Sequence, residues 1–516
     1  MIEDLPVELL DRVFSLLAEP DTGEIKREPQ CNRTDALYNL CLVSRQFRDL
    51  AQPLLFRYFD GDDIEDFRPL ILFTKAVVRR PELGEHVKYV TVTMGPEAPL
   101  VPAGGAEQMT ADDRVLFGGA IRELELGDEE ERWMGAMEIA DLSVLIVLLT
   151  SKTPNIRALR AAHGQIFIMP FLTLWKKQPS YLSSLEQIWI ACDGIYAEYP
   201  IPTYEKFLTL PKMTAPTFET GDLVASGFPN WGPGSLAAEE LAFNDCYIEG
   251  PALKKLTKAC KRVKAFTCQN FSLDAIEFRN GQKMFTAADM HAALLPHKDT
   301  LEHIHLEYFR PPEVIDGIET YADYCARQAK LPSLREFPRL ESVVIQHALL
   351  PEHPRFPPSL ETLHITDCNS SIREMIQNIA RDVKNGHYPK MWQLLVLAVD
   401  PSRPIKLPGQ IVPKDQTPTQ SMLALRDLFK ETKVDFHIFP YALVPPEFGG
   451  VSDISDALHG LDGGPGGPPP MPPMPPMPPG LLEMFMQRAM ADPDFAALMG
   501  DPDDDAQSWE TDDDVD

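Results

Sequence analysis

The beginning of the chain carries two stretches in which apolar side chains recur at helical spacing. In residues 5–17 the intervening positions are mostly polar, which predicts an amphipathic helix, and the apolar positions are Leu5, Leu9, Leu10, Val13, Phe14 and Leu17. Asp4 can cap this helix and Pro6 suits its first turn. Residues 37–50 repeat the spacing with Leu37, Leu40, Val43, Phe47 and Leu50. We therefore expect two short helices near the start of the chain.

Two helices this short cover only part of each other's apolar surface. Burying one large aliphatic or aromatic side chain contributes roughly 1.5–3 kcal/mol, so the remaining apolar face favours a partner. Two interpretations stay open at this point. The helices form either a cap that seals a larger domain or a docking module that completes its core on another protein.

A different pattern, apolar-x-x-apolar-x-apolar, returns through the middle of the chain. It begins at residues 87, 156, 185, 238, 263, 301, 340, 360 and 392. Helix-like segments such as 251–260, 287–295 and 371–383 lie between these sites. A short strand alternating with a helix predicts a solenoid of leucine-rich-repeat type, although the spacing is irregular. An ordinary α/β domain whose parallel strands share the pattern is the alternative.

The cysteines fit a structural role in such repeats. Counting nine positions from the first apolar residue of a segment reaches Cys246 and Cys368, and Asp193 and Asp400 in two other segments; Asn or Cys is common there in leucine-rich repeats. None of the eight cysteines forms a CxxC pair, and we see no secretory signal. We therefore expect free thiols in a reducing compartment, the cytoplasm or the nucleus.

Charge and hydropathy narrow the classes of partner. The chain has 516 residues and a formal net charge of −29, which argues against nucleic acid or an anionic membrane as the main partner. The most apolar run, residues 142–150, is far shorter than the roughly 20 residues that a membrane span needs. We expect it to be a buried helix.

Four further regions are set apart by composition. The acidic stretch around residues 95–132 is interpreted as a surface insertion or loop. Residues 463–480 hold ten prolines and five glycines, which predicts an extended linker. Residues 481–500 are a candidate amphipathic helix that either binds a partner or folds back on the repeats. Residues 501–516 carry nine acidic side chains and no base, which predicts disorder.

The two opening stretches resemble a known family. "LPVELLDRVFSLL" followed by "LYNLCLVSRQFRDLAQPLLFRYF" closely resembles an F-box, with a polar insertion, residues 18–35, between its halves. An F-box joined to leucine-rich repeats is similar to the F-box substrate receptors common in fungi. The expected fold class is α/β. The expected parts are an N-terminal helical F-box (1–60), an irregular leucine-rich-repeat solenoid (61–445), a Gly/Pro/Met-rich linker (446–480), a short helix (481–500) and an acidic tail (501–516).

The resemblance implies a partner for the surplus apolar face. F-boxes dock on a Skp-family adaptor, which links them to a cullin–RING ubiquitin ligase. Carried over to this sequence, the adaptor-binding set is Leu5, Pro6, Leu9, Leu10, Val13, Phe14, Leu17, Leu42, Val43 and Phe47. Some of these must hold the F-box helices together, and the sequence does not divide them. The alternative is a scaffold that binds the adaptor without cullin.

The repeats would then hold the protein substrate. Because side chains alternate along a strand, a face of the strands should carry the candidate substrate-binding residues Arg160, Trp189, Asn244, Gln269, His303, His305 and His364. His303 and His305 with Glu307 could ligate zinc only if further ligands converge, so a solvated face is the preferred interpretation. The sequence holds no phosphate loop, nucleophile elbow or HExxH motif. We expect a non-catalytic subunit without metal or cofactor.

Overall fold

The structure is a computed structural model of residues 1–516. It describes residues 5–18, 31–61, 67–93, 109–161, 165–191, 201–269, 284–308, 326–368, 372–398 and 424–440. The chain divides into two compact units, Met1–Ser452 and Asp453–Asp516. All the described elements belong to the first unit. The linker, short helix and acidic tail expected in residues 446–516 lie outside the described residues.

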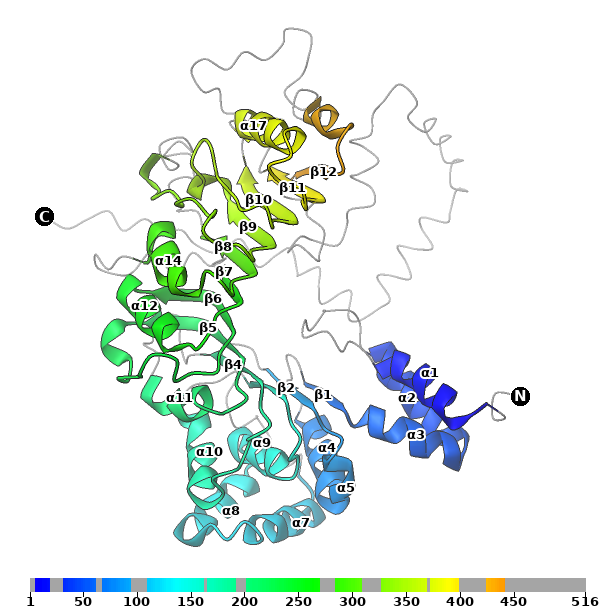
Figure 1. The fold of residues 1–516 in the computed structure, drawn as a ribbon. Helices are drawn as coiled ribbons and strands as arrows, with labels where there is room; N and C mark the ends of the chain where they lie inside the picture. The colour runs from blue at the N-terminus through cyan, green and yellow to red at the C-terminus, as the bar shows by residue number, and fades with distance from the viewer. Residues whose placement is uncertain are drawn as a thin grey trace, which may run out of the picture. The chain divides into compact units, whose positions relative to one another are not determined.

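Three helices open the described chain (Figure 1). They are α1 (Val7–Ala18), α2 (Cys31–Val43) and α3 (Arg45–Leu55). Both opening stretches of the sequence are therefore helical as expected. The second stretch is divided, because Ser44 has extended backbone angles between α2 and α3.

A single parallel sheet of twelve strands follows, and the strands are ordered along the sheet as they are in the sequence. They are β1 (Tyr58–Gly61), β2 (Tyr89–Val92), β3 (Ala158–Ala161), β4 (Gln187–Ala191), β5 (Ala215–Leu223), β6 (Glu240–Ile248), β7 (Ala265–Gln269), β8 (His303–Glu307), β9 (Ser342–Gln346), β10 (Thr362–Cys368), β11 (Gln393–Ala398) and β12 (Asp435–Pro440). Nine of these coincide with the repeated sequence pattern. The pattern did not predict β1, β5 or β12.

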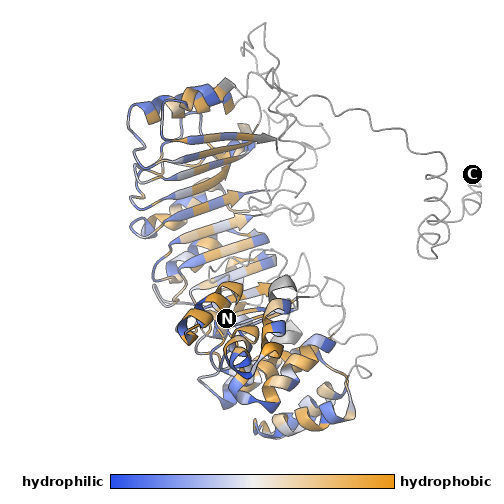
Figure 2. Cartoon of the chain, turned by 90° about the vertical axis from the view of Figure 1, so that its right-hand side faces the viewer, coloured by the Kyte–Doolittle hydropathy of each residue, from blue (hydrophilic) through white to orange (hydrophobic). Residues whose placement is uncertain are grey.

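The repeated pattern explains the core. In eight of the nine segments all three apolar positions are buried, and the parallel register aligns the second and third positions in rows on one face of the sheet. The segment that begins at residue 392 is one residue out of register, since Leu394 and Val396 are aligned with the buried rows whereas Leu395 and Leu397 lie on the opposite face. The middle row is buried in every strand named here: Phe59, Val90, Leu159, Ile188, Leu241, Phe266, Ile304, Val343, Leu363, Leu394 and Phe436. Alternating hydrophobic and hydrophilic bands are visible along the strands (Figure 2). Burial of these rows stabilises the sheet, since each large side chain contributes roughly 1.5–3 kcal/mol.

Helices connect the strands. They are α4 (Arg68–Arg79), α5 (Pro81–Gly84), α7 (Ala111–Arg122), α8 (Glu130–Glu138), α9 (Leu142–Ser151), α10 (Gln165–Lys177), α11 (Ile201–Leu208), α12 (Gly250–Ala259), α14 (Ala287–Leu294) and α17 (Ile372–Lys384). Helices α11, α12 and α14 lie along one side of the sheet (Figure 1). The run expected to be a buried helix is α9, whose residues 142–150 are all buried.

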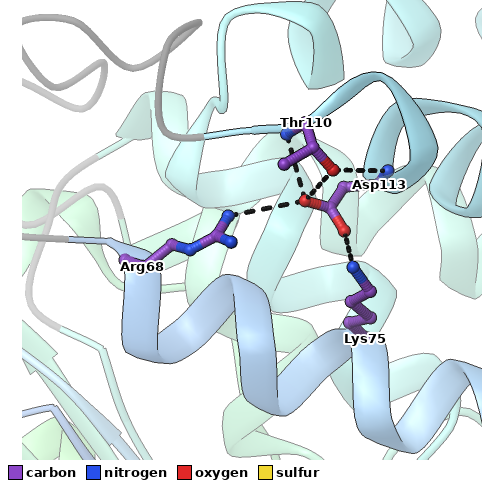
Figure 3. Close-up of polar contacts among 4 residues, drawn as sticks. All are labelled: Arg68, Lys75, Thr110 and Asp113. Atoms are coloured by element: carbon purple, nitrogen blue, oxygen red, sulfur yellow. Dashed lines mark hydrogen bonds and ion pairs between the residues drawn. The ribbon is translucent and has the colours of Figure 1, made fainter.

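Of the acidic stretch, residues 109–132 are described and are largely helical, so the loop interpretation was wrong for this part. Helix α7 begins with a capping box, in which Thr110 accepts from the backbone of Asp113 and Asp113 accepts from the backbone of Thr110. The buried Asp113 carboxylate also pairs with Lys75 and, at 3.5 Å, with Arg68, both on α4 (Figure 3). Hydrogen bonds from Lys75 and Thr110 outweigh the effect of burial and hold the pKa of Asp113 at about 2. Acidity here stabilises a helix terminus.

Among the described residues, no single helix is long and apolar enough to cross a membrane. The bent pair Gly127–Glu138 and Leu142–Ser151 would meet those criteria only when taken together.

Candidate functional site

The three opening helices enclose a small core of their own. Leu10, Phe14, Leu37, Cys41, Phe47 and Ala51 are its buried members. The rings of Phe14 and Phe47 meet edge to face with their centroids 5.2 Å apart, a favourable arrangement for two aromatic side chains. The helical module therefore has a complete core without help from another protein.

The junction between α2 and α3 is held by local hydrogen bonds. The Ser44 hydroxyl accepts from the backbone N–H of Phe47 at 3.2 Å, which caps α3. The Arg48 Nε donates to the carbonyl of Cys41 at 3.1 Å. In the segment "LVSRQF" the capping residue Ser44 thus lies three positions before the core residue Phe47. The extended backbone of Ser44 ends one helix and begins the next.

A second apolar stripe on the same helices is exposed to solvent. Leu9, Val13 and Leu16 recur at spacings of four and three residues in α1, so they share one side of the helix, and Leu5 lies just before the helix begins. The exposed fractions of Leu5, Leu9, Val13 and Leu16 are 38%, 50%, 46% and 67%. On α2 the exposed apolar side chains are Tyr38, Leu42 and Val43. We call these seven residues the apolar stripe. A group of exposed apolar side chains on a folded module is typical of a protein-binding surface.

The end of α3 joins this module to the sheet. Leu54 and Leu55 pack on the module core, whereas Phe56 packs on the core of the sheet. The Phe56 ring stacks on Phe73 of α4 with centroids 5.2 Å apart, and Arg80 donates to Gln52 of α3 at 3.3 Å. The last turn of α3 therefore belongs to both cores.

Residues 2–60 match the family model described as F-box-like. This F-box-like domain comprises α1, α2, α3 and the start of β1, and it implies binding to a Skp-family adaptor. F-box proteins are typically non-catalytic adaptor subunits. No curated protein matches the chain.

Side-chain burial in the F-box-like domain separates the ten predicted adaptor-binding residues into those that pack in the core and those that are exposed. Leu10, Phe14 and Phe47 are at most 3% exposed and fill the module core, so we reassign them from adaptor contact to folding. Leu17 is partly buried and packs against the same core. The other six are exposed: Leu5, Pro6, Leu9, Val13, Leu42 and Val43.

Sequence reasoning missed two members of the apolar stripe. Leu16 lies three residues after Val13, and Tyr38 lies four residues before Leu42. Helical spacing was the available signal in both cases. Helical spacing alone was insufficient, because the exposed apolar stripe and the buried core residues of the same helices are both apolar.

The predicted substrate-binding residues share the face of the sheet opposite the buried rows. Arg160, Trp189, Asn244, Gln269 and His305 are partly exposed, and His303 is exposed. The Arg160 guanidinium contacts the carboxylate of Glu219 on β5 at 3.3 Å. We call this surface the outward face of the sheet.

Polar side chains on β7 and β8 contact one another on this face. His305 Nε2 lies 2.7 Å from a Glu307 carboxylate oxygen and 3.0 Å from the Gln269 side-chain amide. Burial raises the pKa of Glu307, but the hydrogen bond and charge of His305 outweigh it, so the pKa is lowered. Within the described ranges no group of three or more His, Cys, Asp or Glu side chains could hold a metal ion. His305 is therefore positioned by hydrogen bonds.

The outward face is covered over β10 and β11. His364, Thr366, Leu395 and Leu397 point away from the buried rows, yet each is at most 9% exposed. The Gln393 side-chain oxygen Oε1 accepts a hydrogen bond from His364 Nε2 at 3.0 Å, and burial lowers the pKa of His364. We therefore remove His364 from the candidate contact set, because its side chain is not accessible.

Cys41, Cys246, Cys260, Cys268 and Cys368 are buried, and none of these five forms a disulfide. Cys246 and Cys368 donate to backbone carbonyls at 3.3 and 3.2 Å near the ends of β6 and β10. These contacts agree with the structural role expected from the ninth-position rule. Asp193 and Asp400 lie outside the described residues.

Proposed function

We propose that this chain is the substrate-recognition subunit of a Skp–cullin–F-box ubiquitin ligase. The F-box-like domain would dock the Skp-family adaptor, and the outward face of the sheet would hold a protein substrate. The observation that carries the proposal is an exposed apolar stripe on a module whose own core is complete. Such a stripe is not required for folding, and a partner groove would bury it.

The physics of the stripe fits a helix-in-groove interface. A few large apolar anchors dominate such contacts. Leu9, Val13 and Leu16 project from one side of α1, and Leu42 adds a fourth large side chain from α2. A charge introduced at the centre of this stripe would be buried without a partner on docking, which is costly.

The strand order supports a leucine-rich-repeat solenoid as the finer description of the sheet. One strand is contributed by each apolar segment, and every strand pairs only with its neighbours in sequence. The partly exposed outward face of β3 to β8 is the proposed substrate surface. The ligase chemistry would then belong to the partners, with this chain supplying proximity.

Two further parts of the proposal concern the cellular compartment and the role of cullin. Free, buried cysteines support action in the cytoplasm or nucleus. The second candidate function keeps the adaptor and omits cullin, so that the protein acts as a scaffold; the same exposed stripe supports it.

Capture of the adaptor from cell extract by the full chain tests the proposal. The variant Leu9→Glu, Val13→Glu changes two exposed residues of the stripe, so the module core stays intact. The control Asp11→Lys changes charge by two units on the exposed opposite side of α1. Wild type and control should retain the adaptor, and the double variant should lose it.

Probing the same captures for cullin separates the candidates. Adaptor and cullin together support the ligase subunit. Adaptor without cullin supports the scaffold. If wild type captures neither, or if the double variant binds as wild type does, the stripe is not the docking surface and the proposal fails.

A further inference from the structure

A small cavity lies among three of the helices that connect the early strands. Helices α8 and α9 precede β3 and α10 follows it; α9 packs against both of the others, and Figure 1 shows the three next to one another. The cavity between them has a volume of about 70 Å³. It shares no residue with the apolar stripe or with the outward face of the sheet. We call it the elbow pocket.

A sharp bend of the chain shapes this pocket. The segments Gly127–Glu138 and Leu142–Ser151 meet at an angle of 116°, and Ala140 in the bend has a φ of 57°, in the left-handed region. The Asp141 carboxylate then accepts from the backbone N–H of Ser143 at 2.9 Å, which caps α9. Because α9 is buried, the bend is fixed, and the pocket is formed before any partner binds. Such preorganisation lowers the entropic cost of docking.

Apolar side chains from all three helices line the pocket. Trp133 and Ala136 belong to α8, Val144 to α9, and Met169 and Pro170 to α10. Trp133 is 2% exposed, whereas Met169 is 46% exposed, so the pocket has a buried wall and an accessible rim. A cavity of about 150 Å³ holds a benzene molecule. A cavity of half that volume therefore suits one aliphatic side chain better than an aromatic ring.

Negative charge is concentrated around the pocket. Glu129 and Asp141 are among its lining residues. The segment Glu123–Asp141, which supplies one side of the pocket, holds eight acidic side chains and one basic side chain. In the part of the chain that the structure describes, Glu130 and Glu131 beside the pocket form no ion pair.

Cations offset only part of this charge. Arg132 lies 3.5 Å from Glu129, but both side chains are exposed, and exposed ion pairs neutralise their partners weakly. Lys152 pairs with Glu123 at 2.7 Å, and the ammonium group of Lys177 lies near Gly127. An excess of negative charge remains, so the surroundings of the pocket favour a cationic partner.

We infer that the elbow pocket docks a segment of a partner protein in which one aliphatic side chain is flanked by lysine or arginine. The aliphatic side chain fills the cavity, and the flanking cations meet the carboxylates around it. One well-packed apolar anchor with a polar rim is the usual composition of a small docking site. The inference goes beyond the proposed function, because it assigns a third surface and a third partner to the chain.

Fluorescence polarisation with the full chain tests the inference. The probes are four labelled pools of nine-residue peptides. Three pools have flanks of lysine and arginine around a central leucine, alanine or tryptophan, and the fourth has a central leucine between aspartate and glutamate. The basic leucine pool should bind at least about fivefold more tightly than the alanine and tryptophan pools, and at least about tenfold more tightly than the acidic pool. The central residue isolates the cavity, because attraction of basic flanks to an acidic chain does not depend on it.

Two variants block the pocket in different ways. Ala136→Met places a longer side chain in the cavity, and Met169→Lys places a cation on its rim at a position that is 46% exposed, so the fold is retained. Either variant should reduce binding of the basic leucine pool to the level of the alanine pool. Equal binding of the leucine, alanine and tryptophan pools to wild type, or undiminished binding by Met169→Lys, would overturn the inference.

A matched pair of variants tests the role of the negative charge. Glu129→Gln, Glu130→Gln should weaken binding of the basic leucine pool at least about threefold. The control Glu336→Gln, Glu374→Gln removes two exposed carboxylates outside the three helices, and it should bind within about twofold of wild type. An equal loss in both pairs would show attraction to the net charge of the chain and would also contradict the assignment.

Adaptor capture with the same variants separates this inference from the proposed function. Met169→Lys should still capture the adaptor, since the apolar stripe is untouched. A wild type that captures the adaptor but shows no preference for the central leucine refutes the elbow pocket alone. A wild type that prefers the basic leucine pool but captures no adaptor refutes the proposed function alone.

Discussion

Replacing Phe14 with alanine should unfold the F-box-like domain rather than weaken its surface. Phe14 is 2% exposed and belongs to a core of six buried residues. Removing a buried phenylalanine ring costs about 3–5 kcal/mol, of which the edge-to-face pair with Phe47 accounts for about 0.5–1.5 kcal/mol. Domains are stable by only about 5–15 kcal/mol, and small ones lie at the lower end. The substitution should therefore remove most of the domain's stability.

Amide hydrogen exchange measured by mass spectrometry can locate the loss. Protection in α1, α2 and α3 should fall in Phe14→Ala, and protection in α9 should persist because its residues 142–150 are buried in the other core. Leu16→Ala is the matched control: Leu16 is 67% exposed, so its truncation should cost less than about 0.5 kcal/mol. Undiminished protection in Phe14→Ala, or an equal loss in Leu16→Ala, would refute the division into core and stripe.

Two further predictions concern buried ionisable groups. The pKa of Asp113 is lowered to about 2 from 3.8, so its ionised form contributes about 2 kcal/mol to the free energy of unfolding at neutral pH. Asp113→Asn should lose this contribution in urea unfolding at pH 7. The difference in the free energy of unfolding between variant and wild type should shrink as the pH falls from about 4 toward 2. A pH-independent difference would contradict the assignment. Burial raises the pKa of Cys260 to about 12, and burial also raises the pKa of Cys268. Iodoacetamide at pH 8 should therefore label both thiols only after denaturation, as read by mass spectrometry. Rapid labelling of the native chain would exclude their burial.

The strands could be predicted where three apolar positions were intact. Strand β5 was not predicted because Pro216 occupies the middle apolar position of the pattern. Strand β1 was not predicted because Gly61 occupies the last apolar position. The helix α7 was missed because Gly118 and Gly119 favour a loop interpretation. Its capping box, Thr110 with Asp113, was a readable signal in the sequence.

The sequence predicts which residues of the opening helices are apolar, but it does not predict which of them are exposed and which are buried. Helical spacing finds both stripes of α1, but it cannot say which stripe meets α2 and α3, because that depends on how the three helices pack.

The nearest-neighbour order of the strands makes the chain tolerant of length changes. Tyr89 and Ala158 are partners in register although 69 positions separate them, whereas Ser342 and Thr362 are partners across 20 positions. An inserted segment therefore leaves the hydrogen-bonded ladder in place, because its two ends return to adjacent rungs. Surface segments between strands can consequently be exchanged one at a time, and recognition of new partners could be acquired while the F-box-like end is kept unchanged.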